Sequence, residues 1–192
     1  MNRVRMLIVT LVFLLPVNFA FAASDSAKGK EKLTGDDERF VKEAASGGLM
    51  EVQLGKIAAG KASNQRVKEF GKRMQQDHGK ANDQLKKIAA NKGVELPKEP
   101  SGEHKRTLNR LTKLTGAEFD REYMEAMVDD HKDDIEKFEK QADKGKDPAV
   151  KKFASDNLPL LKKHLELAQS TQKQLEAGSK GGSKAAPKAG SK

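Results

Sequence analysis

The sequence predicts an all-α protein that folds as an antiparallel four-helix bundle. In four segments, apolar residues recur at the spacing of one helix face. Short turns join the first segment to the second and the third to the fourth, whereas residues 91–116 separate the middle two. A connection of that length permits a long crossover along the bundle, with a short helix inside it. Cysteine is absent, so a buried helical core rather than disulfides must stabilise the fold.

The first predicted helix covers residues 37–61, and the second covers residues 67–90. Asp36 and Asp37 supply N-terminal capping chemistry for the first helix. Asn91 and Gly93 end the second. The inward faces are predicted to hold Phe40, Ala44, Gly47, Leu54 and Ala58 in the first helix, and Val67, Phe70, Gly71, Met74, Ala81, Leu85, Ile88 and Ala89 in the second.

The short helix of the crossover is predicted over residues 101–114, the third long helix over residues 117–144 and the fourth over residues 148–177. Asp147 and Pro148 form the N-terminal turn of the fourth helix. The inward residues are Tyr123, Met124, Met127, Ile135, Phe138 and Ala142 in the third helix, and Val150, Phe153, Ala154, Leu161, Leu165, Ala168 and Leu175 in the fourth.

Two helical hairpins joined by one long crossover form the ferritin-like arrangement. The hairpins also resemble each other in sequence: Phe40 corresponds to Phe119, and the segment VKEF at residues 67–70 corresponds to VKKF at residues 150–153. A simple up-and-down bundle and a three-helix variant remain alternatives.

Both ends of the chain differ in composition from the predicted bundle. Residues 1–22 have the features of a signal peptide: two arginines, an apolar run and Ala20-Phe21-Ala22 as a cleavage pattern. A polar lead-in follows at residues 23–35, the bundle domain covers residues 36–177 and an unstructured tail covers residues 178–192. We expect export to the bacterial periplasm with no membrane span after cleavage; retention of the signal as an anchor is the alternative.

The net charge of +9 is concentrated outside the predicted bundle. Residues 24–172 hold 30 basic and 27 acidic side chains, so the folded part is nearly balanced. The tail is rich in Lys, Gly, Ala and Ser and has too little apolar surface to fold. It serves either as a solubilising segment or as a weak tether to an anionic envelope surface. Nucleic acid is not expected as a partner of an exported chain whose basic segment lacks aromatic residues.

Four ionisable residues interrupt the apolar faces, one in each long helix: Glu51, His78, His131 and His164. Each lies near the middle of its helix. In an antiparallel bundle the midpoints of all helices lie at one height. The sequence therefore predicts a polar layer halfway along the core.

Three imidazoles and a carboxylate match the ligand set of a single transition metal ion, Zn²⁺, Fe²⁺, Mn²⁺ or Cu²⁺. A structural polar network that sets the register of the helices is the competing interpretation. The third interpretation is that the apparent layer is a coincidence of the helical phase assumed for each segment.

Four more residues are candidates to form hydrogen bonds with the layer residues and to orient them: Asp77, Asp130, Asp134 and Tyr123. An aspartate next to a histidine in a helix points about 100° away from it, so Asp77 and Asp130 would orient imidazoles of neighbouring helices. Solvation of the aspartates and core packing of Tyr123 are the alternatives. His104, in the crossover, belongs to no apolar face and is expected to be solvated.

The segments EAASGGLMEVQLGKIA, FGKRMQQDH, FDREYMEAMVDDH and LPLLKKHLE, within residues 37–168, together resemble a family of exported bacterial proteins known as domain of unknown function 4142. This resemblance implies a ferritin-like bundle in the periplasm or envelope and implies no established activity. True di-iron ferritins carry Glu-x-x-His on two helices. Here Gln75, Val128 and Leu161 stand three residues before the histidines, which argues against a two-iron centre.

The functional hypothesis is a periplasmic metal-binding bundle engaged in metal handling or the response to oxidative stress. The alternative is an envelope interaction protein with a structural polar layer and a cationic tail. Enzymatic activity is not expected, because the sequence shows no nucleophile motif.

Overall fold

The computed structural model describes residues 32–182, and in this part of the chain the regular secondary structure is all α-helix, without strands. Five helices follow one another along it: α1 (Gly35–Lys61), α2 (Gln65–Lys92), α3 (Gly102–Leu111), α4 (Gly116–Lys144) and α5 (Pro148–Gly182). None of the helices in residues 32–182 is both long enough and apolar enough to cross a membrane. The predicted signal peptide and most of the lead-in lie outside the described residues.

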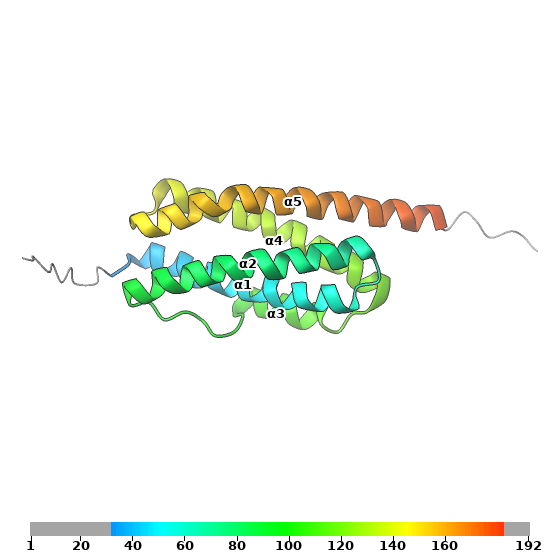
Figure 1. Ribbon diagram of the computed structural model, residues 1–192, viewed down its shortest axis with the longest axis horizontal. Coiled ribbons are helices and arrows are strands. Elements are labelled where there is room, and N and C mark those ends of the chain that lie inside the picture. Colours follow the sequence, from blue (N-terminus) through cyan, green and yellow to red (C-terminus); the bar gives the residue numbers. More distant parts are fainter. Residues whose placement is uncertain (1–31, 183–192) are drawn as a thin grey trace, which may run out of the picture.

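The four long helices form two hairpins that lie along each other (Figure 1). α1 packs against α2, and α4 packs against α5, each pair joined by a short turn. α2 also contacts α5, and α1 contacts α4. The short helix α3 lies against α1 and α4 on the side of the molecule away from α5 (Figure 1). This arrangement is consistent with a ferritin-like helical bundle.

The N-terminus of α1 differs from the prediction that Asp36 and Asp37 provide the cap. Thr34 is the N-cap, and its side chain accepts a hydrogen bond from the Asp37 amide. Asp37 itself is buried and turns toward the α4–α5 connection. Its carboxylate accepts hydrogen bonds from the Gln141 side chain at 2.6 Å and from the Asp147 amide at 2.9 Å. A carboxylate that meets backbone amides of a turn stabilises that turn as a cap would.

A matching contact exists at the opposite end of the molecule. The Asp120 carboxylate of α4 accepts hydrogen bonds from the Ser63 amide at 3.0 Å and the Asn64 amide at 2.7 Å in the α1–α2 turn. Each hairpin thus holds the turn of the other. The two hairpins correspond in sequence, because the same difference in residue number separates the members of three pairs: Asp37 and Asp120, Asn64 and Asp147, Val67 and Val150. Phe40 and Phe119 do not share this difference, so that predicted correspondence is wrong.

The apolar core is divided into two clusters by the polar layer. One cluster contains Met50, Met74 and Met127, and the other contains Leu85, Phe138 and Leu161. Most predicted inward residues are buried, but near the start of α1 the neighbours Val41 and Ala45 are buried, whereas Phe40 and Ala44 are only partly buried. The buried face of α1 is broader than one stripe because α2, α3 and α4 all contact this helix.

The last helix continues beyond its predicted end at residue 177. α5 extends to Gly182, so the first residues of the predicted unstructured tail are helical. Extending an existing helix orders only one residue for each new hydrogen bond, so Gly178 does not stop it. Residues 183–192 lie outside the described part. Pro159 lies inside α5 and does not end it.

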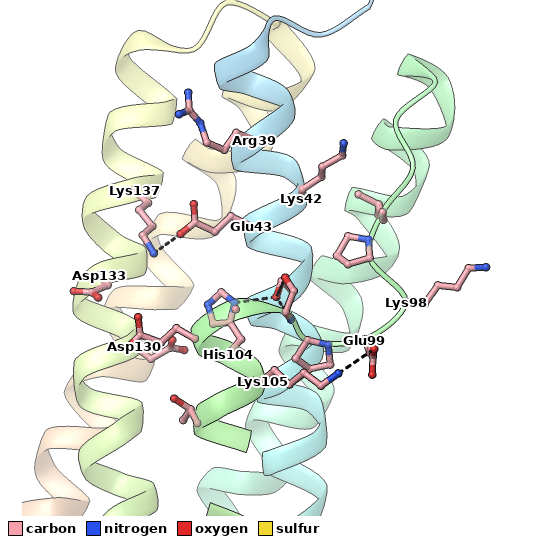
Figure 2. A pocket seen from close by; sticks show the side chains of 18 of the residues that line it. Arg39, Lys42, Glu43, Lys98, Glu99, His104, Lys105, Asp130, Asp133 and Lys137 are labelled. Atoms are coloured by element: carbon pink, nitrogen blue, oxygen red, sulfur yellow. Dashed lines mark hydrogen bonds and ion pairs between the residues drawn. The ribbon is translucent and has the colours of Figure 1, made fainter. Parts of the chain in front are cut away.

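A groove with a volume of about 1450 Å³ lies between α1, the segment that precedes α3, α3 itself and α4. Figure 2 shows charged side chains of both signs along its walls. His104, expected to be solvated, is half-buried here, and its Nδ1 lies 2.9 Å from the Ser46 hydroxyl. The Ser46 hydroxyl also accepts from the Ser101 amide at 2.9 Å, which holds the start of α3 against α1.

Candidate metal centre

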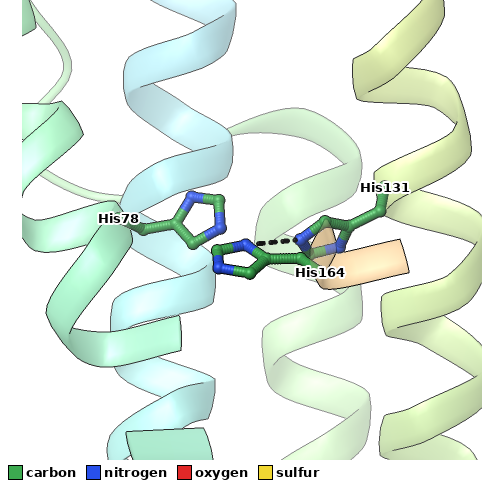
Figure 3. Close-up of side chains that lie close together, drawn as sticks. All are labelled: His78, His131 and His164. Atoms are coloured by element: carbon green, nitrogen blue, oxygen red, sulfur yellow. Dashed lines mark hydrogen bonds between the residues drawn. The ribbon is translucent and has the colours of Figure 1, made fainter. Parts of the chain in front are cut away.

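The four predicted layer residues lie together in the centre of the molecule, one from each long helix. Glu51 of α1 is 1% exposed, His78 of α2 is 6% exposed, and His131 of α4 and His164 of α5 are fully buried. One ring nitrogen of each histidine lies within 4.8 Å of the others, and Figure 3 shows the three rings turned toward one another. Buried groups of this kind need partners, since a polar atom without one costs free energy.

The partners of His131 and His164 determine which nitrogen of each ring carries the proton. Nδ1 of His131 lies 2.9 Å from the Met127 carbonyl oxygen, which only accepts, so Nδ1 is the donor. Nε2 of His164 lies 3.1 Å from an Asp77 carboxylate oxygen and donates to it. In the neutral rings, the remaining nitrogens, Nε2 of His131 and Nδ1 of His164, therefore both carry lone pairs. They face each other at 3.4 Å.

Two lone pairs at this distance form no hydrogen bond, because neither ring has a proton to place between them. A cation between them removes the conflict. Tetrahedral zinc holds imidazole nitrogens at about 2.0–2.1 Å, which places two ligand nitrogens about 3.3 Å apart. The observed separation of 3.4 Å matches this geometry.

Glu51 places a carboxylate beside the histidines. Its Oε2 lies 2.6 Å from Nδ1 of His78, and its Oε1 lies 3.5 Å from Nε2 of His131. Despite these short distances, neither carboxylate oxygen is reached by a hydrogen-bond donor with suitable geometry in the described part of the chain. Nε2 of His78 is buried and likewise lacks a hydrogen-bond partner. The layer thus holds more acceptors than donors.

Burial lowers the pKa values of all three histidines in the layer. It lowers the pKa of His78 to about 4, although the charges of Asp134 and Asp77 act in the opposite direction. Burial, aided by His78, lowers the pKa of His164 to about 4. Burial and the two other imidazoles lower the pKa of His131 well below its ordinary value. All three imidazoles are neutral at pH 7, the protonation state in which histidine binds metals.

The carboxyl groups respond to burial in the opposite sense. Burial, with a smaller contribution from Asp134, raises the pKa of Glu51 well above its ordinary value. A raised carboxyl pKa means that the ionised form lacks compensation in its surroundings. A bound cation or a retained proton supplies that compensation.

The residues predicted to orient the layer histidines occupy different places. Asp77 bonds to His164 on another helix, as its direction on α2 predicts. Asp134 is partly buried and lines a cavity of about 20 Å³ together with Glu51 and His78, enough for roughly one water molecule. Asp130 has a carboxylate oxygen within 4.8 Å of ligand atoms of Glu51 and His131.

Tyr123 is fully buried and stacks on Phe119 with ring centroids 5.4 Å apart. Its hydroxyl has no hydrogen-bond partner within residues 32–182. Burial, followed by the charges of Glu51 and Asp130, raises its pKa well above the ordinary value. The ring therefore packs in the core, and the hydroxyl makes no hydrogen bond to the layer.

The Met127 carbonyl is a partner that the sequence did not predict. Backbone acceptors carry no sequence signal, and this one is available because a side chain four residues on can reach it along the helix.

Comparison with known proteins supports the same fold. The family model of the domain of unknown function DUF4142 matches residues 22–171, which is most of the chain. The chain belongs to the DUF4142 family. No curated protein matches it with significant similarity.

Two solved structures resemble this DUF4142 protein in fold. A DUF305 fragment from Deinococcus radiodurans has a TM-score of 0.65 and 14% identity, covering 74% of this chain and 99% of that one. A predicted secreted DUF305 protein from Streptomyces coelicolor has a TM-score of 0.62 and 10% identity, covering 73% and 94%. At such low identity the similarity concerns the fold alone.

Proposed function

We propose that this DUF4142 protein binds one transition metal ion, Zn²⁺, Fe²⁺, Mn²⁺ or Cu²⁺, in the polar layer formed by Glu51, His78, His131 and His164. The observation that carries the proposal is the pair of facing lone pairs on His131 and His164, 3.4 Å apart. The buried carboxylate of Glu51, which lacks donors, supplies negative charge for the cation. Asp77 would orient His164, as carboxylates orient metal-bound histidines elsewhere.

The proposal also covers the arrangement of the four long helices and the cellular location of the protein. The two hairpins form an antiparallel, ferritin-like four-helix bundle, and the segment carrying α3 is its long crossover. The domain covers residues 36–177 after a cleaved signal peptide and a polar lead-in. The signal-like N-terminus and the secreted description of one structural neighbour support a periplasmic location. Metal handling or the response to oxidative stress is the role that such a site would serve there.

Metal analysis of the protein purified from the periplasm tests the proposal. We expect one equivalent of metal per chain after dialysis against Zn²⁺ or Co²⁺. Imidazole nitrogens should dominate the first shell in X-ray absorption, and EDTA should lower the melting temperature, because binding to the folded state alone stabilises it. A melting temperature that neither EDTA nor added Zn²⁺, Cu²⁺, Mn²⁺ or Fe²⁺ changes, together with no metal uptake, would refute metal binding.

A structural polar network is the second candidate, and one contact favours it. A proton retained on Glu51 would remove the repulsion between its carboxylate and a lone pair on Nδ1 of His78, which lie 2.6 Å apart. The raised pKa of Glu51 is compatible with that proton. In this case the layer sets the register of the helices, and the protein acts in the envelope without metal or enzymatic activity. Infrared spectroscopy distinguishes the two, because a protonated carboxyl absorbs at a frequency where an ionised, metal-bound carboxylate does not.

The lysine-rich tail remains a proposed contact with anionic envelope surfaces. Its supporting feature is charge: the segment after residue 172 holds five lysines and one glutamate. We expect association with anionic vesicles that weakens as salt rises and that requires residues 178–192. Binding that persists after their removal would assign the association to another part of the protein.

A further inference from the structure

A second group of possible ligands overlaps the polar layer on the side of the groove. One ligand atom each from Glu51, Asp130 and His131 lies within 4.8 Å of the others. Asp130 also lines the groove (Figure 2), whereas none of the three layer histidines does. Asp130 therefore connects the buried layer with a space that opens between α1, α3 and α4.

The carboxylates of this group lack hydrogen-bond donors. Both oxygens of Glu51 and Oδ2 of Asp130 are buried without a partner in the described residues. Glu51 is 1% exposed, so bulk solvent does not replace the missing donors there, and the cavity beside it has room for roughly one water molecule. Two buried carboxylates this close to each other need compensation, because each unpaired charge in a buried position is costly, and a cation held between them would supply it.

The shared residue His131 restricts how the two groups are used. Its Nδ1 is bonded to the Met127 carbonyl, so the ring has a single free lone pair, on Nε2. One imidazole lone pair binds one cation. The groove-side position of Glu51, Asp130 and His131 and the inner position of the three histidines are therefore occupied in sequence and not together.

We propose that Asp130 is the entry residue of the metal centre: a divalent cation arrives through the groove, is held by Asp130, Glu51 and His131, and then moves to the three histidines. This inference rests on the proposed metal-binding function. The first position is rich in oxygen and suits a cation that still carries water. The second, rich in nitrogen, retains a transition metal ion.

The charges along the groove favour this route. Asp129 and Asp133 are exposed on α4 beside Asp130 and line the same groove. Two basic side chains of the wall are paired with glutamates (Figure 2): Lys137 with Glu43 at 2.7 Å, and Lys105 with Glu99 at 3.2 Å. Pairing reduces their repulsion of an incoming cation, and the aspartates of α4 raise its local concentration.

Rapid-mixing measurements of Zn²⁺ uptake and chelator-driven release test the route on the purified full protein. Asp130→Asn keeps the shape of the side chain and removes its charge. We expect it to slow uptake and release by a similar factor, about tenfold. The equilibrium dissociation constant should stay within about twofold, because a residue used only in transit affects both rates alike. Asp156→Asn, an exposed aspartate of α5 outside the groove, is the matched control and should change neither rate.

A charge reversal at the groove provides a second measurement that does not disturb the buried layer. Asp133→Lys should slow uptake several-fold at low salt and less at high salt, whereas Asp156→Lys should have no effect. Unchanged rates in both Asp130→Asn and Asp133→Lys would overturn the route. A loss of equilibrium affinity in Asp130→Asn with unchanged uptake would also overturn it, since Asp130 would then be a permanent ligand. A wild-type protein that takes up no metal would remove the proposed function itself.

Discussion

Replacing Asp77 by alanine should weaken metal binding although Asp77 is not itself a proposed ligand. Its carboxylate accepts the Nε2 proton of His164 at 3.1 Å and thereby leaves the Nδ1 lone pair facing His131. Without this acceptor, the proton can move to Nδ1. His164 then donates to Nε2 of His131 across 3.4 Å, and this hydrogen bond competes with the metal.

The size of the effect follows from the surroundings of Asp77. Loss of the partner of a metal-bound histidine typically reduces affinity by about 10–100-fold, or about 1.4–2.7 kcal/mol. The Asp77 side chain is 20% exposed, so water can accept part of the hydrogen bonding after the substitution. We therefore expect a loss near about tenfold. His164→Ala, which removes a ligand atom, should reduce affinity considerably more.

Competition titration of Zn²⁺ against a chromophoric chelator near neutral pH measures these affinities. The matched control is Asp83→Ala, an exposed aspartate of the same helix that pairs with Lys86 at 3.0 Å. It should bind Zn²⁺ as the wild type does. Wild-type affinity in Asp77→Ala, or a loss in His164→Ala no larger than in Asp77→Ala, would refute this account of His164.

Three further predictions concern stability. Burial raises the pKa of Asp134 to about 6, so in the metal-free protein this carboxyl gains a proton as the pH falls through 6, and the proton stabilises the fold. The gain opposes the cost of keeping the buried histidines neutral, because the unfolded chain protonates its histidines below their ordinary pKa of 6.5. Asp134→Asn should therefore lose about 1 kcal/mol more than the wild type between pH 7 and 5 in urea titrations with EDTA, and equal losses would contradict this. Gly71→Ala places a Cβ 2.7 Å from the Ala58 Cβ and should cost about 1–3 kcal/mol in denaturant unfolding, whereas Gly79→Ala, with open space around it, should be neutral or stabilising. Asp120→Ala leaves two turn amides without their acceptor and should cost about 2–3 kcal/mol by the same measurement; a cost below about 0.5 kcal/mol would show that water replaces the carboxylate.

Much of the fold was predictable because its local signals agree with one another. Turn residues and apolar periodicity placed every helix, and the ends of α1 and α4 agree with prediction to within two residues. The prediction was wrong where a tertiary contact outweighs the local signal. Asp37 has the sequence of a capping residue, but the turn at Asp147 binds its carboxylate, and Thr34 caps the helix instead.

The candidate site was predictable as a set of residues and not as a geometry. Helical phase placed Glu51, His78, His131 and His164 on inward faces because a charged or polar residue in an apolar stripe has no other side to point to. The pairing of Asp77 with His164 depends on how α2 is rotated relative to α5, and the residue pattern within one helix carries no information about that rotation. The groove that reaches Asp130 depends on where α3 packs.

The sequence by itself determined most of the buried residues of each helix and the height of the polar layer, since both follow from the helical repeat and from helix length. Only the tertiary structure decided which nitrogen of His164 is free and what it faces. Its Nε2 proton is held by Asp77 of a different helix, and its free Nδ1 faces Nε2 of His131, whose Nδ1 proton is held by the Met127 carbonyl of its own helix. These two proton positions leave lone pairs facing each other at 3.4 Å, and this contact turns a row of buried histidines into a candidate cation site.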